Sequence, residues 1–329
     1  MKEELIDAIS RCSAAVEARI ADLLPRKAGD ALSDCLWYHL SVGGKKLRPA
    51  LCLLTCEALG GRTERALDFA AAVELLHNAL LVHDDIEDGD EMRRDQPALW
   101  VKYGIANALN TGDYLLGAAY AAVLRAPGPA ELKGRLMVAF NDAFLRTVEG
   151  QALDIRFRAD PDFTLDKYQE MVELKTGFYL ALGMVGGAMI AQASDGTIER
   201  LWRFGKYAGP AFQVRDDVLD LTPGKGRGGK IGSDIEEGKA SILYAHALSV
   251  APPDDRQRLI RIMSLPRKST PPDDVRWVMG LYEECGTLDF ARRYAAERLA
   301  LAKAEIRSLP LVANELLAAL TDYMIERRS

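Results

Sequence analysis

The sequence lacks the features of a secreted or membrane-spanning protein. It has no stretch of about 18 uncharged apolar residues, the length needed to cross a bilayer. The N-terminus, Met1-Lys2-Glu3-Glu4-Leu5, has neither the basic start nor the apolar run of a secretion signal. We therefore expect a cytoplasmic protein without a membrane span.

Cysteines are few, and negative charge exceeds positive charge. The five cysteines are scattered, at positions 12, 35, 52, 56 and 285. Cys52 and Cys56 lie one helical turn apart, a spacing at which two cysteines can bind zinc together. No second Cys or His pair stands nearby, however, so buried packing is the favoured interpretation. The net charge of −6 argues against nucleic acid as a partner.

Strand patterns are missing as well. Ala and Leu dominate, and helical periodic segments are separated by short Gly/Pro stretches such as Ala126 to Pro129, 251–254 and 266–274. There is no internal repeat. The 329 residues, 49% of them hydrophobic, are expected to form one large all-α helical bundle over residues 1–329.

Two acidic clusters of the same form stand far apart, Asp84-Asp85-Ile86-Glu87-Asp88 and Asp216-Asp217-Val218-Leu219-Asp220. In a helix, the first and last aspartates of each cluster project from one face, one turn apart. Such carboxylates repel one another unless a cation neutralises them. Mg²⁺ is usually held by one or two carboxylates plus phosphate oxygens, so the clusters predict a magnesium site for a phosphorylated substrate.

Either cluster alone would also suit a solvated, acid-rich helix end. The preceding residues weaken that interpretation. Residues 69–82 and 207–214 are strongly apolar and are expected to form helices that run through the interior. The two clusters are therefore predicted at the ends of core helices.

Basic residues that suit a diphosphate accompany the clusters. Gly43 to Pro49 is a glycine-opened loop leading into a helix, in which Lys45 and Arg48 can reach one anion together. The adjacent residues Arg93 and Arg94 point in different directions, which suits two separate phosphate groups. An ordinary capped helix start and a charge-balancing arginine pair are the alternatives.

A glycine-rich loop follows the second cluster. Residues 224–230 match GxxxxGK, yet Ile231 replaces the Ser/Thr of a P-loop and an acidic helix precedes the match. Nucleotide hydrolysis is therefore not expected. What remains is a basic loop carrying Lys230, followed by Lys239, that can fold over a phosphate.

Together these motifs resemble the trans-isoprenyl diphosphate (polyprenyl) synthases, in the order and spacing of that family across residues 43–239. The matching segments are Gly43 to Pro49, His77, the first DDxxD with Arg93 and Arg94, Gly150-Gln151 with Asp154, Lys175-Thr176, Phe212-Gln213, the second DDxxD, and 229–234 with Gly238-Lys239. The resemblance implies an all-α isoprenoid synthase fold of roughly ten core helices around a central cavity. It also implies a homodimer that condenses isopentenyl diphosphate with an allylic diphosphate. Residues 245–329 are expected to be packing helices.

Position by position, the resemblance implies several groups of site residues. The magnesium ligands would be Asp84, Asp85, Asp88, Asp216, Asp217 and Asp220. The clamp for the allylic diphosphate would be Arg93, Lys175, Lys230 and Lys239, and the isopentenyl diphosphate site would be Lys45, Arg48, His77 and Arg94. Thr176, Gln213 and Asp154 match positions that line the reaction centre. The predicted catalytic residues are Asp84, Asp88, Arg93, Lys175, Asp216 and Lys230.

The product length is predicted from the residues before Asp84, because the growing tail is expected to run alongside that helix. Where the family makes short products, an aromatic residue commonly stands four or five residues before this aspartate. Here Leu80 and the small Ala79 occupy those positions. Side chains further down, including Leu76, Leu75, Phe178 and Tyr179, would stop the tail. We expect geranylgeranyl diphosphate or a somewhat longer product, with farnesyl diphosphate as the alternative.

Two other function classes share some of these features. A class I terpene cyclase also uses DDxxD, and Asn141 to Glu149 resembles its second metal motif, but Leu145 stands where a hydroxyl ligand is needed. A non-catalytic subunit of a two-component synthase typically lacks the aspartates, and all are present here. The second DDxxD and the Lys45/Arg48 loop favour a magnesium-dependent prenyltransferase.

Overall fold

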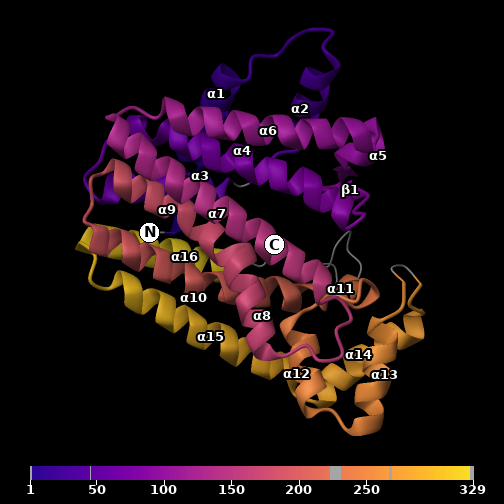
Figure 1. The fold of residues 1–329 in the computed structure, drawn as a ribbon. Coiled ribbons are helices and arrows are strands. Elements are labelled where there is room, and N and C mark those ends of the chain that lie inside the picture. Colours follow the sequence, from indigo (N-terminus) through magenta and orange to yellow (C-terminus); the bar gives the residue numbers. More distant parts are fainter. Residues whose placement is uncertain (1, 45, 223–230, 267–268, 327–329) are drawn as a thin grey trace. The chain divides into compact units, whose positions relative to one another are not determined.

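Helices make up most of the protein (Figure 1). The computed structural model describes residues 2–44, 46–222, 231–266 and 269–326. Within these residues the expected all-α fold is confirmed, and the one sheet that they contain is a hairpin of two short strands.

The elements follow one another along the chain with short connections. The first are α1 (Lys2–Leu23), α2 (Ala31–Ser41), α3 (Leu47–Ala58), α4 (Thr63–Glu87), β1 (Met92–Arg93), β2 (Gln96–Pro97), α5 (Leu99–Tyr103), α6 (Ile105–Arg125) and α7 (Ala130–Arg156). The others are α8 (Leu165–Val172), η1 (Glu173–Gly177), α9 (Phe178–Ile190), α10 (Asp195–Asp220), α11 (Ser233–Glu236), α12 (Ile242–Val250), α13 (Pro253–Met263), α14 (Pro272–Glu284), α15 (Thr287–Ile306) and α16 (Leu311–Glu326).

The chain forms two compact units. Unit 1 comprises Met1–Phe144, Leu182–Leu201 and Leu309–Leu320, and unit 2 comprises Leu145–Ala181, Trp202–Ser308 and Thr321–Ser329. Four of the five boundaries fall within α7, α9, α10 and α16, and the fifth lies between α15 and α16. The single domain expected over residues 1–329 stays a prediction.

Helix α4 forms the centre of unit 1. Its residues from Phe69 to Leu76 are all buried, and it packs against α1, α3 and α6 (Figure 1). Among the described helices, α4 alone has the length and apolar character of a membrane span, and 72% of its most apolar window is buried within the structure. A core helix with apolar residues on all sides passes the same test.

Unit 2 has a core of its own around α12. This helix packs against α8, α13, α14 and α15, and the tyrosines Tyr168, Tyr244 and Tyr282 are fully buried among their apolar side chains. The described residues beyond 245 are helical, as expected, and many of them belong to this core.

The β1–β2 hairpin follows the first acidic cluster. Met92 pairs with Pro97 and Arg93 with Gln96 across a two-residue turn. The turn residues Arg94 and Asp95 both have positive φ, 52° and 62°, a conformation that usually selects Gly or Asn. Strands of two residues are too short to leave a periodic signal, which is why the sequence did not reveal them.

Candidate active site

The first acidic cluster lies at the C-terminal end of α4. The side chain of Asp84 is 26% exposed, whereas that of Asp85 is 1% exposed. Asp88 caps the helix, and its backbone N–H donates to the Asp84 carbonyl at 2.8 Å. The adjacent aspartates of this motif therefore have different surroundings, because one faces outward and the other faces the core.

Arg93 of β1 lies directly against this cluster. Its Nε donates to Asp85 Oδ1 at 2.8 Å, and its Nη2 also pairs with that oxygen. The same Nη2 lies 3.8 Å from Asp84 Oδ2 and 3.9 Å from Asp90 Oδ2. Burial raises the pKa of Asp85 to about 6, although the Arg93 guanidinium opposes this rise. The predicted phosphate-binding arginine is thus held by a buried carboxylate.

Arg94 points to a different part of unit 1, as predicted for adjacent arginines. A Cβ added to Gly44, where φ is +140°, would lie 2.5 Å from Arg94 Nη1, so the guanidinium sits directly over the glycine backbone. Only glycine permits this approach. Arg94 therefore meets the glycine loop that leads into α3, the helix that carries Arg48.

His77 and Glu74 of α4 lie close to these basic groups. Loss of hydration, followed by the charges of Arg48 and Arg94, holds the pKa of His77 well below its usual value, so the ring is neutral. Burial raises the pKa of Glu74, which is opposed by the nearby Lys46 and Arg48. The structure therefore brings Arg48, His77 and Arg94 together.

A neutral, buried His39 on α2 makes this region sensitive to acid. Burial and the charges of Arg93 and Arg94 lower its pKa to about 4. Between pH 6.5 and about 4, His39 is protonated in the unfolded chain but stays neutral in the folded protein. As the pH is lowered through this range, the free energy of unfolding therefore decreases by up to about 3 kcal/mol. We expect His39→Gln to flatten this part of the stability curve, measured by urea unfolding at pH 7 and pH 4.5. An unchanged slope between these pH values would contradict the assignment.

The second acidic cluster lies at the C-terminal end of α10, in unit 2. The side chain of Asp216 is 44% exposed, whereas that of Asp217 is 1% exposed. Asp217 Oδ1 accepts from Gln213 Nε2 at 3.1 Å and from Lys239 Nζ at 3.5 Å. Burial raises the pKa of Asp217, and the Lys239 ammonium opposes this rise.

The other oxygen of Asp217 is occupied too. Asp217 Oδ2 accepts from the Tyr168 hydroxyl at 3.2 Å and from the Ile242 backbone N–H at 3.3 Å. Burial, followed by the Asp217 charge, raises the pKa of Tyr168 far above its usual value, so the hydroxyl stays protonated and donates. Asp217 thus links α8, α10 and the start of α12.

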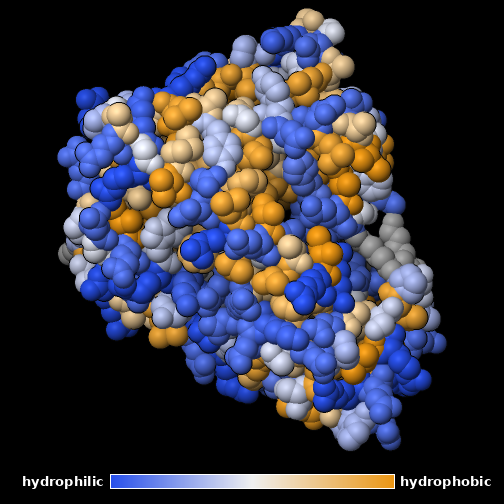
Figure 2. Space-filling view, in the orientation of Figure 1, coloured by the Kyte–Doolittle hydropathy of each residue, from blue (hydrophilic) through white to orange (hydrophobic). Residues whose placement is uncertain are grey.

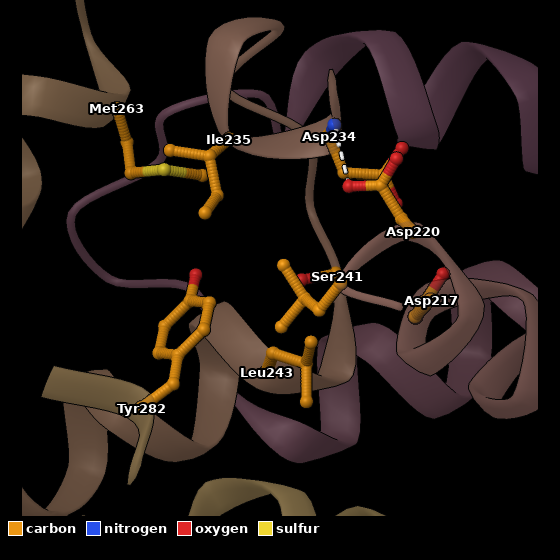
Figure 3. A pocket seen from close by; sticks show the side chains of 9 residues that line it. Asp217, Asp220, Asp234, Ile235, Ser241, Leu243, Met263 and Tyr282 are labelled. Carbon is orange, nitrogen blue, oxygen red and sulfur yellow. Dashed lines mark hydrogen bonds between the residues drawn. The ribbon is translucent and has the colours of Figure 1, made fainter. Parts of the chain in front are cut away.

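Asp220 is bound by the segment that opens α11. Ser233 Oγ donates to Asp220 Oδ1, and the Asp234 backbone N–H donates to Asp220 Oδ2 at 3.1 Å. Figure 3 shows the side chains of Asp220 and Asp234 next to one another beside a small pocket, with Tyr282 across from them. Lys239 Nζ donates to Asp234 Oδ2 at 2.9 Å, so this lysine is shared between Asp217 and Asp234.

Lys175 and Thr176 lie in a π-helical turn, η1, between α8 and α9. A Cβ added to Gly150 of α7 would lie 2.2 Å from the Lys175 backbone nitrogen, so the two backbones touch. Lys175 Nζ donates to Asp154 Oδ2 at 2.5 Å, and Thr176 Oγ1 lies 3.5 Å from Gln213 Oε1. Single π turns inside helices are frequent at functional sites, and this one carries two of the predicted site residues.

Asp154 is therefore a partner of Lys175. Although burial opposes it, the ammonium groups of Lys175 and Lys239 lower the pKa of Asp154. This carboxylate stays ionised and holds the cation of the π turn in place.

Of the residues predicted to set product length, Leu75, Leu76, Ala79 and Leu80 lie on α4, whereas Phe178 and Tyr179 begin α9. His77, Leu80, Leu81 and Asp84 are all partly exposed and share one helix face, whereas Ala79 and Leu76 are buried. An apolar strip thus continues from Asp84 toward the interior of unit 1.

These contacts do not test all of the predictions. Lys45 and Lys230 fall outside the described residues. The two aspartate clusters belong to different units, so their facing one another stays a prediction. The sequence did not reveal Tyr168, Asp90 or His39 as part of the site. Tyr168 has no sequence signal of its own, because its partner Asp217 is distant in the chain.

The donor set suits a hard metal ion. Both clusters offer carboxylate oxygens, the ligands that Mg²⁺ prefers. Among the described residues, no three His, Cys, Asp or Glu side chains are grouped so that they could hold a metal alone.

Curated proteins similar to this chain include archaeal prenyl diphosphate synthases. A short chain isoprenyl diphosphate synthase of Methanothermobacter thermautotrophicus is 35% identical over 98% of this chain and 99% of its own length. A geranylgeranyl diphosphate synthase of Methanosarcina mazei is 33% identical over 98% of both chains. A geranylfarnesyl diphosphate synthase of Natronomonas pharaonis is 31% identical over 95% of this chain and 94% of its own.

Solved structures show the same fold. Geranylgeranyl pyrophosphate synthetase from Pyrococcus horikoshii has a TM-score of 0.91 at 35% identity, covering 99% of both chains. A polyprenyl synthase from Caulobacter crescentus, complexed with calcium and isoprenyl diphosphate, has a TM-score of 0.85 at 27% identity over 98% of both chains. The sequence profile described as polyprenyl synthetase matches residues 30–282. This chain therefore belongs to the polyprenyl synthetase family.

Proposed function

We propose that this protein is a trans-prenyltransferase that joins isopentenyl diphosphate head-to-tail to an allylic diphosphate, and that it makes geranylgeranyl diphosphate or a somewhat longer product. One observation carries the proposal. In each unit a partly exposed aspartate, Asp84 or Asp216, stands beside a buried aspartate that pairs with an arginine or lysine side chain. Family membership and relatives named for geranylgeranyl and geranylfarnesyl diphosphate support it.

The basic residues suit the two diphosphates of this reaction. In unit 2, Lys175 and Lys239 are ordered by carboxylates and can exchange these partners for phosphate oxygens. In unit 1, the family resemblance assigns Arg93 to the allylic diphosphate and Arg48, His77 and Arg94 to isopentenyl diphosphate. Cations placed in advance stabilise the charge that develops on the leaving diphosphate.

Divalent ions, Mg²⁺ in our proposal, would be held by the partly exposed carboxylates of Asp84 in unit 1 and of Asp216 in unit 2, together with diphosphate oxygens. Calcium together with isoprenyl diphosphate in the Caulobacter structure supports a divalent ion at such a site. When bound, the ion would add positive charge at the departing diphosphate. The apolar residues of α4 would keep water away from the allylic cation.

The decisive experiment is an assay with isopentenyl diphosphate and dimethylallyl, geranyl or farnesyl diphosphate, with the product chain length read by chromatography. Condensation that depends on Mg²⁺ is expected. Cyclised products would instead identify a terpene cyclase, and no turnover by the isolated chain would identify a non-catalytic subunit.

We also propose that the protein is a homodimer. Helix α6 exposes Ile105, Leu109 and Leu124, and Figure 2 shows hydrophobic residues gathered at the surface over α5 and the start of α6. Exposed apolar patches of this kind commonly mark protein contacts. The cytoplasmic location stays a prediction.

Replacing Ile105 and Leu109 together with glutamate is expected to weaken the dimer at least tenfold, because two charges would have to be buried at the contact. Light scattering over a range of concentrations measures the mass. Val312→Glu, at an exposed apolar residue of α16, serves as the matched control. A wild-type protein that is monomeric at all concentrations would contradict the proposal.

A further inference from the structure

The adjacent aspartates of each DDxxD motif have opposite surroundings. In both motifs the side chain of the first is partly exposed, Asp84 at 26% and Asp216 at 44%, and that of the second is 1% exposed. In both motifs the second also holds a cation, since Asp85 pairs with Arg93 and Asp217 with Lys239. Equal roles for adjacent aspartates do not explain this repeated arrangement.

The contacts of Asp217 leave it no capacity for a metal. A carboxylate offers about four lone-pair sites. Those of Asp217 accept from Gln213, Lys239, Tyr168 and the Ile242 backbone, two donors to each oxygen. A metal ion could reach either oxygen only by displacing a donor, and a buried donor left unpaired is costly.

We propose that Asp217 is a positioning residue, which acts on the allylic diphosphate through Lys239 and is not a metal ligand. This inference rests on the proposed function, because it takes Lys239 as part of the diphosphate clamp. It removes Asp217 from the six expected magnesium ligands, and Asp216 remains as the metal-facing acid of its motif.

The cation needs such a partner because a lysine side chain is long and flexible. Its ammonium would otherwise have to be ordered when the diphosphate binds, at a cost in affinity. Between Asp217 Oδ1 and Asp234 Oδ2, at 3.5 and 2.9 Å, Lys239 Nζ is ordered beforehand. Gln213, which also binds Asp217, lies 3.5 Å from Thr176 and so connects Asp217 to the π turn.

A double-mutant cycle tests the proposal by the binding of farnesyl diphosphate, measured calorimetrically with Mg²⁺ and without isopentenyl diphosphate. Asp217→Asn and Lys239→Gln are each expected to weaken binding about tenfold, and the double variant also about tenfold, because both changes remove one unit. An additive loss of about a hundredfold, or no loss in Asp217→Asn, would overturn it.

The Mg²⁺ dependence separates positioning from ligation. Asp216→Asn is expected to raise the Mg²⁺ concentration for half-maximal binding at least tenfold, whereas Asp217→Asn should leave it within about twofold. Equal shifts in the two variants would make Asp217 a ligand. Asp160→Asn, which removes another lysine-paired carboxylate of unit 2, is the matched control and should change neither value.

If Asp217→Asn does not fold, Tyr168→Phe removes only one hydroxyl from the same carboxylate, and we expect about threefold weaker binding with an unchanged Mg²⁺ requirement. Unaltered affinity in this variant would then overturn the proposal. A wild-type protein that binds farnesyl diphosphate without condensing it refutes the proposed function alone. One that does not bind it refutes both.

Discussion

Replacing Asp84 with asparagine is expected to lower kcat for condensation at least about 10²-fold. Asp84 is the partly exposed aspartate of the first cluster, one turn from Asp88 on the same helix face. Asparagine keeps the size of the side chain but loses the charge that attracts a divalent ion. The measurement is steady-state product formation from isopentenyl and farnesyl diphosphates.

Glu87→Gln provides the matched control. Glu87 is an exposed acid of the same five-residue cluster, but it occupies one of the two variable positions of the DDxxD motif. Its replacement should leave kcat within about twofold. Chelation with EDTA is expected to abolish turnover in the wild-type protein, and added Mg²⁺ should restore it. Full activity after chelation would exclude the metal role of both clusters.

Enlarging Ala79 is expected to shorten the product by at least one isoprene unit. Ala79 is small and buried, and it lies five residues before Asp84. A larger side chain there would block a tail that passes along α4 toward Leu76. The series Ala79→Val, Ala79→Leu and Ala79→Phe should shorten the product progressively, as measured by chromatography of the dephosphorylated alcohols.

Stability has to be followed in the same series, because overpacking a core costs about 1–3 kcal/mol. Ala121→Phe, at an exposed position of α6, adds the same volume at the surface and should leave the product unchanged. A product distribution that is identical in Ala79→Phe and the wild-type protein would refute the assigned tunnel floor. In that case Leu80, on the partly exposed face with Asp84, becomes the next position to enlarge.

The helical fold and the family were predictable because each rests on local patterns. Apolar periodicity marks α4 and α10, and both aspartate clusters fall at the C-terminal ends of these helices, as expected from the sequence. The basic motifs could be recognised in the same way, since their residues are neighbours in the chain. Arg94 against Gly44 confirms that one such motif is completed in space by another.

The π turn and the hairpin were not predictable from periodicity. A π turn has the composition of the helix around it, and here it is accompanied by the contact between Gly150 and the Lys175 backbone. The hairpin holds Arg94 and Asp95 at positive φ, a conformation that is uncommon for arginine. Tertiary contacts decide both.

By itself, the sequence determined which residues are acidic, basic or apolar and how they recur along each helix, and these local properties specify the helices and the two DDxxD motifs. Only the tertiary structure decided which aspartates of each motif are buried, Asp85 and Asp88 in the first and Asp217 and Asp220 in the second. The four donors to Asp217 come from Tyr168, Gln213, Lys239 and Ile242, on different elements of unit 2. Hydrogen bonds between residues distant in the chain depend on how the helices pack. Two adjacent aspartates of one motif can therefore have different chemical roles.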